Sequence, residues 1–212
     1  MNDMSRISTL TAVRQQPVPR DQTQALLDLR SAASGQIKPA DLYTLADRLE
    51  GQARAFPDRP FLIDGEQRVT YAAVEAQANR MAHVFYAKGL RPGDVCAIAM
   101  ENRPQFFYSW FGLVKLGVVV AFINTQVSGK PLVHALQSTA ARAVVVGEEC
   151  LANLLGTQGL PDVPLWLVND ALNPFDGELP AIVDIDFEQH VAAAPATVFA
   201  RDVRAAITAE TT

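Results

Sequence analysis

An almost unbroken apolar stretch, from Phe106 to Ile123, limits what this chain can fold into. Its length is close to the roughly 18 residues that a membrane-spanning helix needs. However, Lys115 stands in its middle, where a bilayer interior costs a charged side chain roughly 2.5–3.5 kcal/mol. Phe106–Leu116 is rich in aromatics and helix formers, whereas Val118–Ile123 is mostly β-branched. We therefore predict a buried helix, a turn at Gly117 and a buried strand, with no transmembrane segment.

Short apolar runs of this kind recur along the middle of the chain. Val95–Met100, Ala143–Val146 and Leu165–Val168 have the composition of strands that are buried on both faces. Helical patterns separate these runs, so strands and helices alternate along the chain. This alternation predicts an α/β fold with a mostly parallel sheet that is flanked by helices on both faces.

The helices between these strands have recognisable starts and core-facing residues. Thr70 is expected to cap a long helix, Pro104 to open a second and Ser128 to cap a third that runs from Pro131 to Ala140. Another helix is expected from Asp41, and a weaker helical pattern lies near Cys150 to Leu155. In the helix after Thr70, one apolar face is expected to point into the core, and it comprises Val74, Ala78, Met81 and Phe85.

A β-hairpin is expected before the first parallel strand. Two strand-like runs flank an Asp64-Gly65 turn within Phe61–Tyr71. Residues 1–40 form a polar N-terminal extension in which only Ala25–Leu29 suggests a short helix. Residues 41–170 form the α/β part, and residues 171–212 form an irregular C-terminal segment with a single expected strand, Ile182–Phe187.

Charge and cysteine usage exclude several classes of function. The chain has 18 Lys and Arg against 23 Asp and Glu, a formal charge of -5, and no basic block, which argues against nucleic acid as a partner. Neither Cys96 nor Cys150 lies in a CxxC or Cys/His ligand spacing. Met1–Pro19 lacks the apolar stretch of a signal peptide. We therefore expect a reducing, cytoplasmic setting.

Phosphate-binding loops are the motifs that an α/β nucleotide enzyme would need. Ser128-Gly129-Lys130-Pro131 places a Gly-Lys pair at a helix start, but a P-loop needs an earlier glycine and a Ser or Thr after the lysine. No G-x-G-x-x-G follows an expected strand. A helix start with a solvated lysine is the favoured interpretation of this segment.

Candidate nucleophiles and bases are few. The sequence has no G-x-S-x-G, and its three histidines are His83, His134 and His190. His83 and His134 fall on expected helices, where surface or core roles outweigh catalysis. Cys96 lies among apolar strand residues, so it is expected to be a small core side chain and not a reactive thiol.

Two further groups carry alternative interpretations. Asp184 and Asp186 share one face of an expected strand, where they either approach a metal or, as we favour, line the solvated side of an edge strand. Four aromatic residues on one helix either fill the core, which is the favoured role, or line a lipid tunnel. They are Phe106, Phe107, Trp110 and Phe111.

Several motifs resemble one known family. Phe56-Pro57-Asp58-Arg59-Pro60, followed by the hairpin and Val69-Thr70-Tyr71, is similar to the opening of the adenylate-forming acyl-CoA synthetases. Further segments resemble its fatty-acid-transport-protein branch, the long- and very-long-chain acyl-CoA synthetases of the AMP-dependent synthetase/ligase superfamily. They are Asn102–Phe106, Trp110–Gly117, Asn124 and Leu132–Gln137. The resemblance covers roughly 42–168, so residues 41–170 are expected to be the N-terminal subdomain of that fold.

The resemblance implies an acid-thiol ligase that turns fatty acid, ATP and CoA into acyl-CoA, AMP and diphosphate, with Mg²⁺ accompanying the ATP. In the family, a Thr/Ser/Gly-rich loop holds the phosphates, a later aspartate binds the ribose and a C-terminal lysine stabilises the adenylation transition state. None of these is present up to Thr208–Thr212, which falls about where the phosphate loop would begin. We therefore assign no catalytic, cofactor-binding or metal-binding residue, and only the four aromatics are expected near an acyl channel.

The favoured hypothesis is a truncated N-terminal part of a fatty acyl-CoA synthetase, inactive alone and binding no cofactor by itself. Its expected partners are fatty acid and the missing C-terminal portion or another protein chain, with peripheral contact at the inner membrane face. The first alternative is a noncatalytic module that binds fatty acid or a partner protein. The second alternative, ranked last, is a flavodoxin-like nucleotide binder, which lacks a phosphate loop after its first strand.

Overall fold

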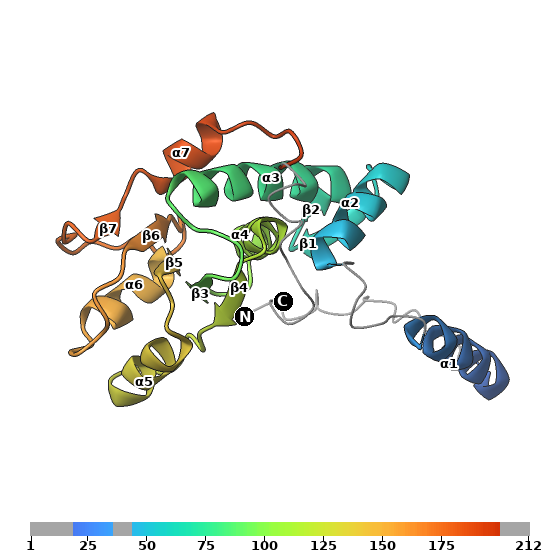
Figure 1. Cartoon of the computed structure of the whole chain (residues 1–212), viewed down its shortest axis with the longest axis horizontal. Helices are drawn as coiled ribbons and strands as arrows, with labels where there is room; N and C mark the ends of the chain where they lie inside the picture. Colours follow the sequence, from blue (N-terminus) through green and yellow to red (C-terminus); the bar gives the residue numbers. More distant parts are fainter. Residues whose placement is uncertain (1–18, 36–43, 200–212) are drawn as a thin grey trace, which may run out of the picture. The chain divides into compact units, whose positions relative to one another are not determined.

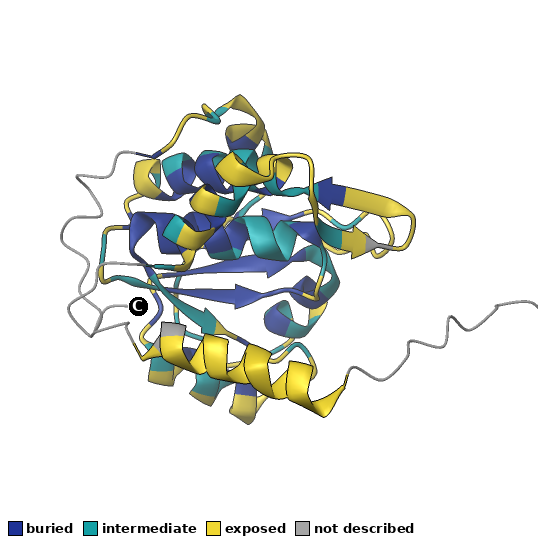
Figure 2. Cartoon of the chain, turned by 90° about the vertical axis from the view of Figure 1, so that its right-hand side faces the viewer, coloured by how far each residue is buried: buried dark blue, intermediate teal, exposed yellow. Residues whose placement is uncertain are grey.

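The computed structural model describes residues 19–35 and 44–199. The chain divides into two units, Met1–Asp41 and Leu42–Thr212, which are described separately. In the first, helix α1 (Arg20–Ser34) is longer than the helix expected at Ala25–Leu29. Its described side chains are exposed, including Leu26, Leu27 and Leu29 (Figure 2). The domain boundaries expected at residues 40 and 170 stay predictions.

A parallel sheet forms the centre of the second unit (Figure 1). Within the described residues it has five strands in the order β4-β3-β5-β6-β7. All adjacent pairs are parallel; Ala97 of the central strand β3, for example, faces Ala121 on one side and Val144 on the other. The strands are β3 (Val95–Ala99), β4 (Val119–Phe122), β5 (Ala143–Gly147), β6 (Leu165–Val168) and β7 (Val183–Asp184).

Helices cover both faces of this sheet, because successive strand residues point to opposite sides. Cys96 and Ile98 face a core formed with α3, α4 and α7. Ala97 and Val146 face a second core formed with α5 and α6. The helices are α3 (Tyr71–Ala87), α4 (Pro104–Leu116), α5 (Lys130–Thr139), α6 (Glu148–Leu155) and α7 (Phe187–Ala193). The predicted α/β fold with a parallel sheet flanked by helices is confirmed, and Figure 2 shows buried strands between helices with exposed outer faces.

The expected hairpin precedes the sheet. Strands β1 (Pro60–Asp64) and β2 (Gln67–Thr70) pair antiparallel around the predicted turn, where Gly65 has a positive φ of 56°. Thr70 caps α3 as predicted, accepting a hydrogen bond from the Ala73 amide at 3.2 Å. The helix expected from Asp41 is α2 (Leu45–Ala55), which begins with a capping box formed by Thr44 and Asp47; residues 41–43 lie outside the described part.

The apolar stretch folds as predicted. Helix α4 ends at Gly117, whose φ of 80° is left-handed, and the chain then enters β4. Among the described residues, no helix is long and apolar enough to cross a membrane.

Two local predictions were wrong. The N-cap of α5 is Gly129 and not Ser128, and no side chain caps this helix. The strand expected over Ile182–Phe187 is limited to β7, because the chain turns at Asp186 and continues as α7. Short strands next to short helices give too few residues for a periodic pattern to separate the two. The remainder of the predicted C-terminal segment, 200–212, lies outside the described residues.

Candidate functional site

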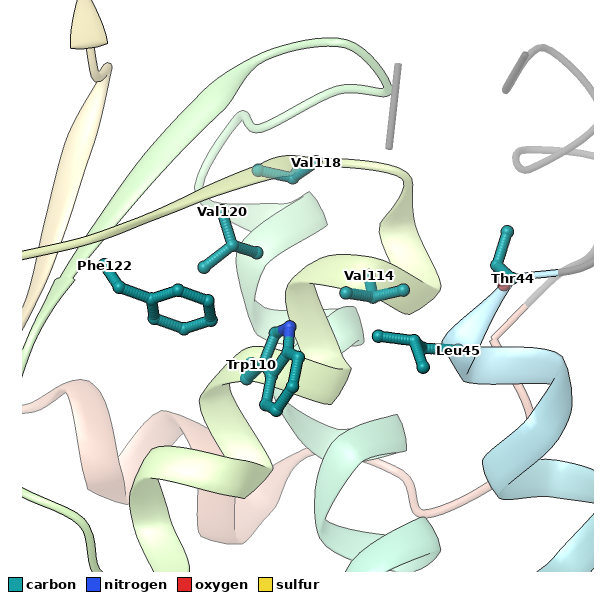
Figure 3. Close-up of a pocket in the computed structure, with 7 residues that line it drawn as sticks. All are labelled: Thr44, Leu45, Trp110, Val114, Val118, Val120 and Phe122. Carbon is teal, nitrogen blue, oxygen red and sulfur yellow. The ribbon is translucent and has the colours of Figure 1, made fainter. Parts of the chain in front are cut away.

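An apolar groove of about 360 Å³ lies between α4, β4 and the start of α2 (Figure 3). Its volume falls within the range of small-molecule sites, roughly 300–1,000 Å³. Figure 3 shows the Trp110 indole between Phe122 on one side and Leu45 on the other. The lining residues are Thr44, Leu45, Trp110, Val114, Val118, Val120 and Phe122.

Regular spacing places these side chains together. Trp110 and Val114 are four residues apart, so they lie on one face of α4. Val120 and Phe122 are two residues apart and point to the same side of β4, which is the edge strand of the described sheet. The ring centroids of Trp110 and Phe122 are 5.3 Å apart in an edge-on arrangement, which closes one end of the groove with aromatic contacts.

The four aromatics predicted for an acyl channel separate into two groups. Trp110 lines the groove, and Phe106 packs behind it against Phe122, with ring centroids 5.4 Å apart. Phe107 and Phe111 turn instead toward the hairpin, where each ring lies 5.7 Å from that of Phe61. The structure therefore places one of the four in the groove wall, and their role in an acyl channel stays a prediction.

Sequence reasoning missed the other walls of the groove. Two local patterns could have predicted part of the groove. Val120 and Phe122 share one face of a strand, and Trp110 and Val114 share one face of α4. Leu45 lies 65 residues from Trp110 in the chain, and only tertiary packing brings the two to the same groove.

The groove suits an apolar ligand and not acid-base chemistry. None of its lining residues is titratable, and its polar side-chain groups are the Thr44 hydroxyl and the Trp110 indole N–H. Phe122 is 51% exposed, so hydrocarbon that reaches the groove would cover an apolar surface that now faces water.

In open α/β folds, ligands usually bind at the carboxyl ends of the parallel strands. The site is a crevice between two adjacent strands whose following connections run in opposite directions. Here that crevice lies between β3 and β5. Arg103 and Glu149 bridge it with an ion pair of 3.1 Å. The Arg103 guanidinium also donates to the carbonyl of Val168 at 2.9 Å, and Glu149 accepts the amide of Glu101 at 2.8 Å.

The Glu149 carboxylate folds back over the end of the strand at Gly147. A Cβ atom at Gly147 would lie 2.2 Å from this carboxylate, so a side chain there would require the carboxylate to move. Arg103, part of a segment that carries the family resemblance, therefore ties strands together at this edge. Its charge is matched by Glu149, which leaves the pair suited to holding the edge and not to binding phosphate.

A buried ion cluster lies among α2, α3 and α4. The Lys115 side chain is 1% exposed, and its ammonium binds Glu50 at 2.9 Å and Glu75 at 2.7 Å. This lysine was recognised in the sequence only as an obstacle to membrane insertion. Its partners lie 65 and 40 residues away, so no local pattern reveals them.

Both cysteines are buried, as predicted for Cys96. Burial raises the pKa of the Cys96 thiol, and burial, assisted by the charge of Glu149, raises the pKa of Cys150 to about 12. A raised pKa lowers the fraction of thiolate, which is the nucleophilic form.

We therefore expect both thiols to stay unreactive toward Ellman's reagent in the native chain at mildly alkaline pH. In denaturing urea, where burial is lost, both should react. Absorbance of the released thionitrobenzoate measures the reaction, and rapid labelling of either thiol without denaturant would contradict the assignment.

The remaining candidates do not form a catalytic group. His134 lies on α5 beside Ser138, whereas His83 and His190 line a different groove between α3 and α7. Asp184 is paired with Lys88, and the Asp186 amide donates to Asp184. In the part of the chain that the structure describes, no cluster of three or more His, Cys, Asp or Glu side chains is placed to hold a metal ion.

Comparisons with known proteins agree with this architecture. The sequence profile of a family described as "AMP-binding enzyme" matches residues 49–203. Human long-chain fatty acid transport protein 6 is 37% identical over 142 residues, covering 64% of this chain and 22% of that protein. Mouse long-chain fatty acid transport protein 1 is 38% identical over 102 residues, covering 47% of this chain and 16% of that protein.

Solved structures share the fold. An anthranilate CoA ligase in complex with anthranoyl-AMP superposes with a TM-score of 0.65 at 23% identity, covering 78% of this chain and 30% of the ligase. A fatty acyl CoA synthetase from Mycobacterium tuberculosis gives a TM-score of 0.61 at 24% identity, covering 73% of this chain and 29% of that enzyme. The chain spans about a fifth of the length of the curated relatives it matches.

Proposed function

The chain belongs to the AMP-binding enzyme family, and from that premise we propose that it forms the N-terminal α/β part of an ATP-dependent fatty acyl-CoA synthetase. The observation that carries the proposal is the 37% identity with a long-chain fatty acid transport protein over 142 residues. The groove beside Trp110 supports a fatty acid as the substrate class, because most of the side chains that line it are apolar.

The proposed reaction has two steps. A fatty acid carboxylate attacks the α-phosphorus of ATP, which forms an acyl-adenylate and releases diphosphate. The CoA thiol then attacks the acyl carbon, which forms acyl-CoA, releases AMP and leaves the thiol proton for solvent or a base. In this scheme the groove orients the acyl chain and keeps water away from it, with Trp110 and Phe122 as its aromatic walls.

The nucleotide is expected to bind elsewhere in a family-length protein. The Ser128–Pro131 segment does not provide a phosphate loop, because it lacks the earlier glycine and the Ser or Thr after the lysine, and because the Gly129 amide donates to Thr157. The described residues provide no acidic cluster for Mg²⁺. We assign no step to these residues, since charge that builds on the α-phosphate needs positioned donors and a metal ion.

We expect the isolated 212-residue chain to make no acyl-CoA. The purified chain is incubated with ATP, Mg²⁺, palmitate and CoA, and palmitoyl-CoA is measured by liquid chromatography with mass detection. A catalytically active long-chain acyl-CoA synthetase assayed in parallel shows that the assay detects product. Thioester above a no-protein control would contradict the expectation.

The groove itself favours a second candidate, a noncatalytic fatty-acid-binding module. Titration with a fluorescent fatty acid tests this candidate, with Trp110→Ala as the test variant. The exposed Tyr86→Ala, away from the groove, is the matched control. The binding module requires saturable binding that Trp110→Ala removes and Tyr86→Ala leaves intact. Without saturable binding by the isolated chain, the binding module is contradicted.

A further inference from the structure

The last described residues, 194–199, form a segment that we call the C-terminal strap. Figure 1 shows the chain leaving α7 and running beside α3. Three neighbouring α3 side chains bind backbone carbonyls here. Asn79 donates to Ala196 at 3.1 Å, and the His83 ring nitrogen bonds to Thr197 at 3.1 Å. The Arg80 guanidinium donates to the carbonyls of Ala192 and Ala194.

The far end of the strap is fixed by packing. Phe199 is only 4% exposed. Its ring centroid lies 5.1 Å from that of His83 and 5.5 Å from that of Tyr86. The strap is therefore held on α3 by hydrogen bonds at its beginning and middle and by an aromatic contact at its end.

The Asn79 contact is linked to the buried ion cluster. Asn79 is 2% exposed, and its amide nitrogen also donates to the Glu75 carboxylate at 3.2 Å. The same Glu75 oxygen accepts from Lys115 at 2.7 Å, and Lys115 binds Glu50 at 2.9 Å. A continuous set of polar contacts thus joins α2, α4 and α3 to the strap.

The hydrogen bonds of the Asn79 amide fix its orientation. The nitrogen of Asn79 has two hydrogens, one for Glu75 and one for Ala196. Its oxygen has no hydrogen-bond partner among the described residues. The orientation of the amide therefore depends on the two bonds that its nitrogen donates. A fixed Glu75 holds one hydrogen and so points the other at the strap.

We propose that Asn79, held by Glu75 and Lys115, is a positioning residue that clamps the C-terminal strap on α3. Loss of the Glu75 acceptor releases the strap and Phe199 while the sheet stays folded. This inference goes beyond the proposed function, because it concerns the path of the chain after α7 and applies whether or not the protein is a ligase.

Native-state proteolysis tests the clamp, because chymotrypsin cleaves after aromatic residues and Phe199 must leave its packed position to be cut. We expect Asn79→Leu to raise the cleavage rate after Phe199 by roughly five- to tenfold, the size expected for one lost hydrogen bond. Glu75→Leu should raise this rate further, because it also removes a carboxylate partner of the buried Lys115 and so destabilises the core. Mass spectrometry of the products identifies the bond that is cut. Glu75→Gln keeps a side-chain oxygen acceptor, so its rate should stay within about twofold of wild type.

Cleavage after Phe85 and Phe187, which are fully buried in the core, measures global unfolding in the same samples. In Asn79→Leu, the clamp requires the Phe199 rate to rise while these two rates stay unchanged. A parallel rise at all three sites in Asn79→Leu would overturn the proposal, because it would mean general destabilisation. A Phe199 rate in Glu75→Leu that rises no more than the two core rates would overturn the link through Glu75, even if Asn79→Leu released the strap.

Discussion

Replacing Lys115 with methionine is expected to lower the free energy of unfolding by about 3–5 kcal/mol, which is a large part of the roughly 5–15 kcal/mol available to a typical domain. The substitution preserves most of the side-chain volume but removes the ammonium that binds Glu50 and Glu75. Two carboxylates near one another in the core would then lose the ammonium that they share. Urea denaturation followed by circular dichroism measures the change.

An exposed ion pair provides the control for Lys115→Met. Arg142 binds Asp94 at 2.8 Å, but the arginine side chain is 58% exposed. Arg142→Met should therefore cost no more than about 1 kcal/mol, because solvent screens such a pair. Adding Glu50→Gln and Glu75→Gln to Lys115→Met should recover part of the stability. If Lys115→Met and Arg142→Met shift the urea midpoint equally, the buried cluster does not make the large contribution to stability that we infer.

The buried cluster shows where sequence reasoning reaches its limit. Three local features were predictable, because the residues that form them lie close together in the sequence. They are the Thr70 cap, the turn at Gly65 and the end of α4 at Gly117. The sheet was predictable because strands buried on both faces leave continuous apolar runs. Lys115 appeared only as a charge inside an apolar run, since its partners come from two other helices.

The same distinction explains the local errors. Ser128 fits the composition of a helix cap, but Gly129 takes that place with a φ of 58° and its amide donates to Thr157, from a distant loop. Helix α7 was missed because its seven residues bury little more than Phe187 and Val191, too few for a periodic pattern. Tertiary contacts decide both positions, and single-sequence propensity does not include them.

The candidate site was also predictable only in its local features. The aromatic face of α4 was visible in the sequence, but which of its residues line the groove was not. Trp110 faces the edge strand, whereas Phe107 and Phe111 face the hairpin residue Phe61. The rotation of α4 about its axis decides this division, and that rotation is set by how α4 packs on α3.

The packing of α4 on α3 leads to the second prediction, that Gly112→Ala lowers the free energy of unfolding by about 2–3 kcal/mol, toward the upper end of the range for overpacking. A Cβ at Gly112 would lie 2.4 Å from the Met81 Cβ and 3.1 Å from the Ala78 carbonyl oxygen. These atoms belong to the α3 backbone or are attached to it directly. The two helices must therefore separate, which also displaces Trp110 from the groove wall.

Gly51→Ala is the matched control for this effect. Gly51 lies inside α2, and a Cβ there would meet nothing within 4 Å. The same chemical change should then stabilise the chain by about 0.5–1 kcal/mol, because alanine favours a helix over glycine. Urea denaturation measures both variants, and tryptophan fluorescence should shift only in Gly112→Ala, since Trp110 shares its helix. Equal and small effects of the two substitutions would mean that α3 and α4 tolerate separation, and that their close contact does not orient the groove.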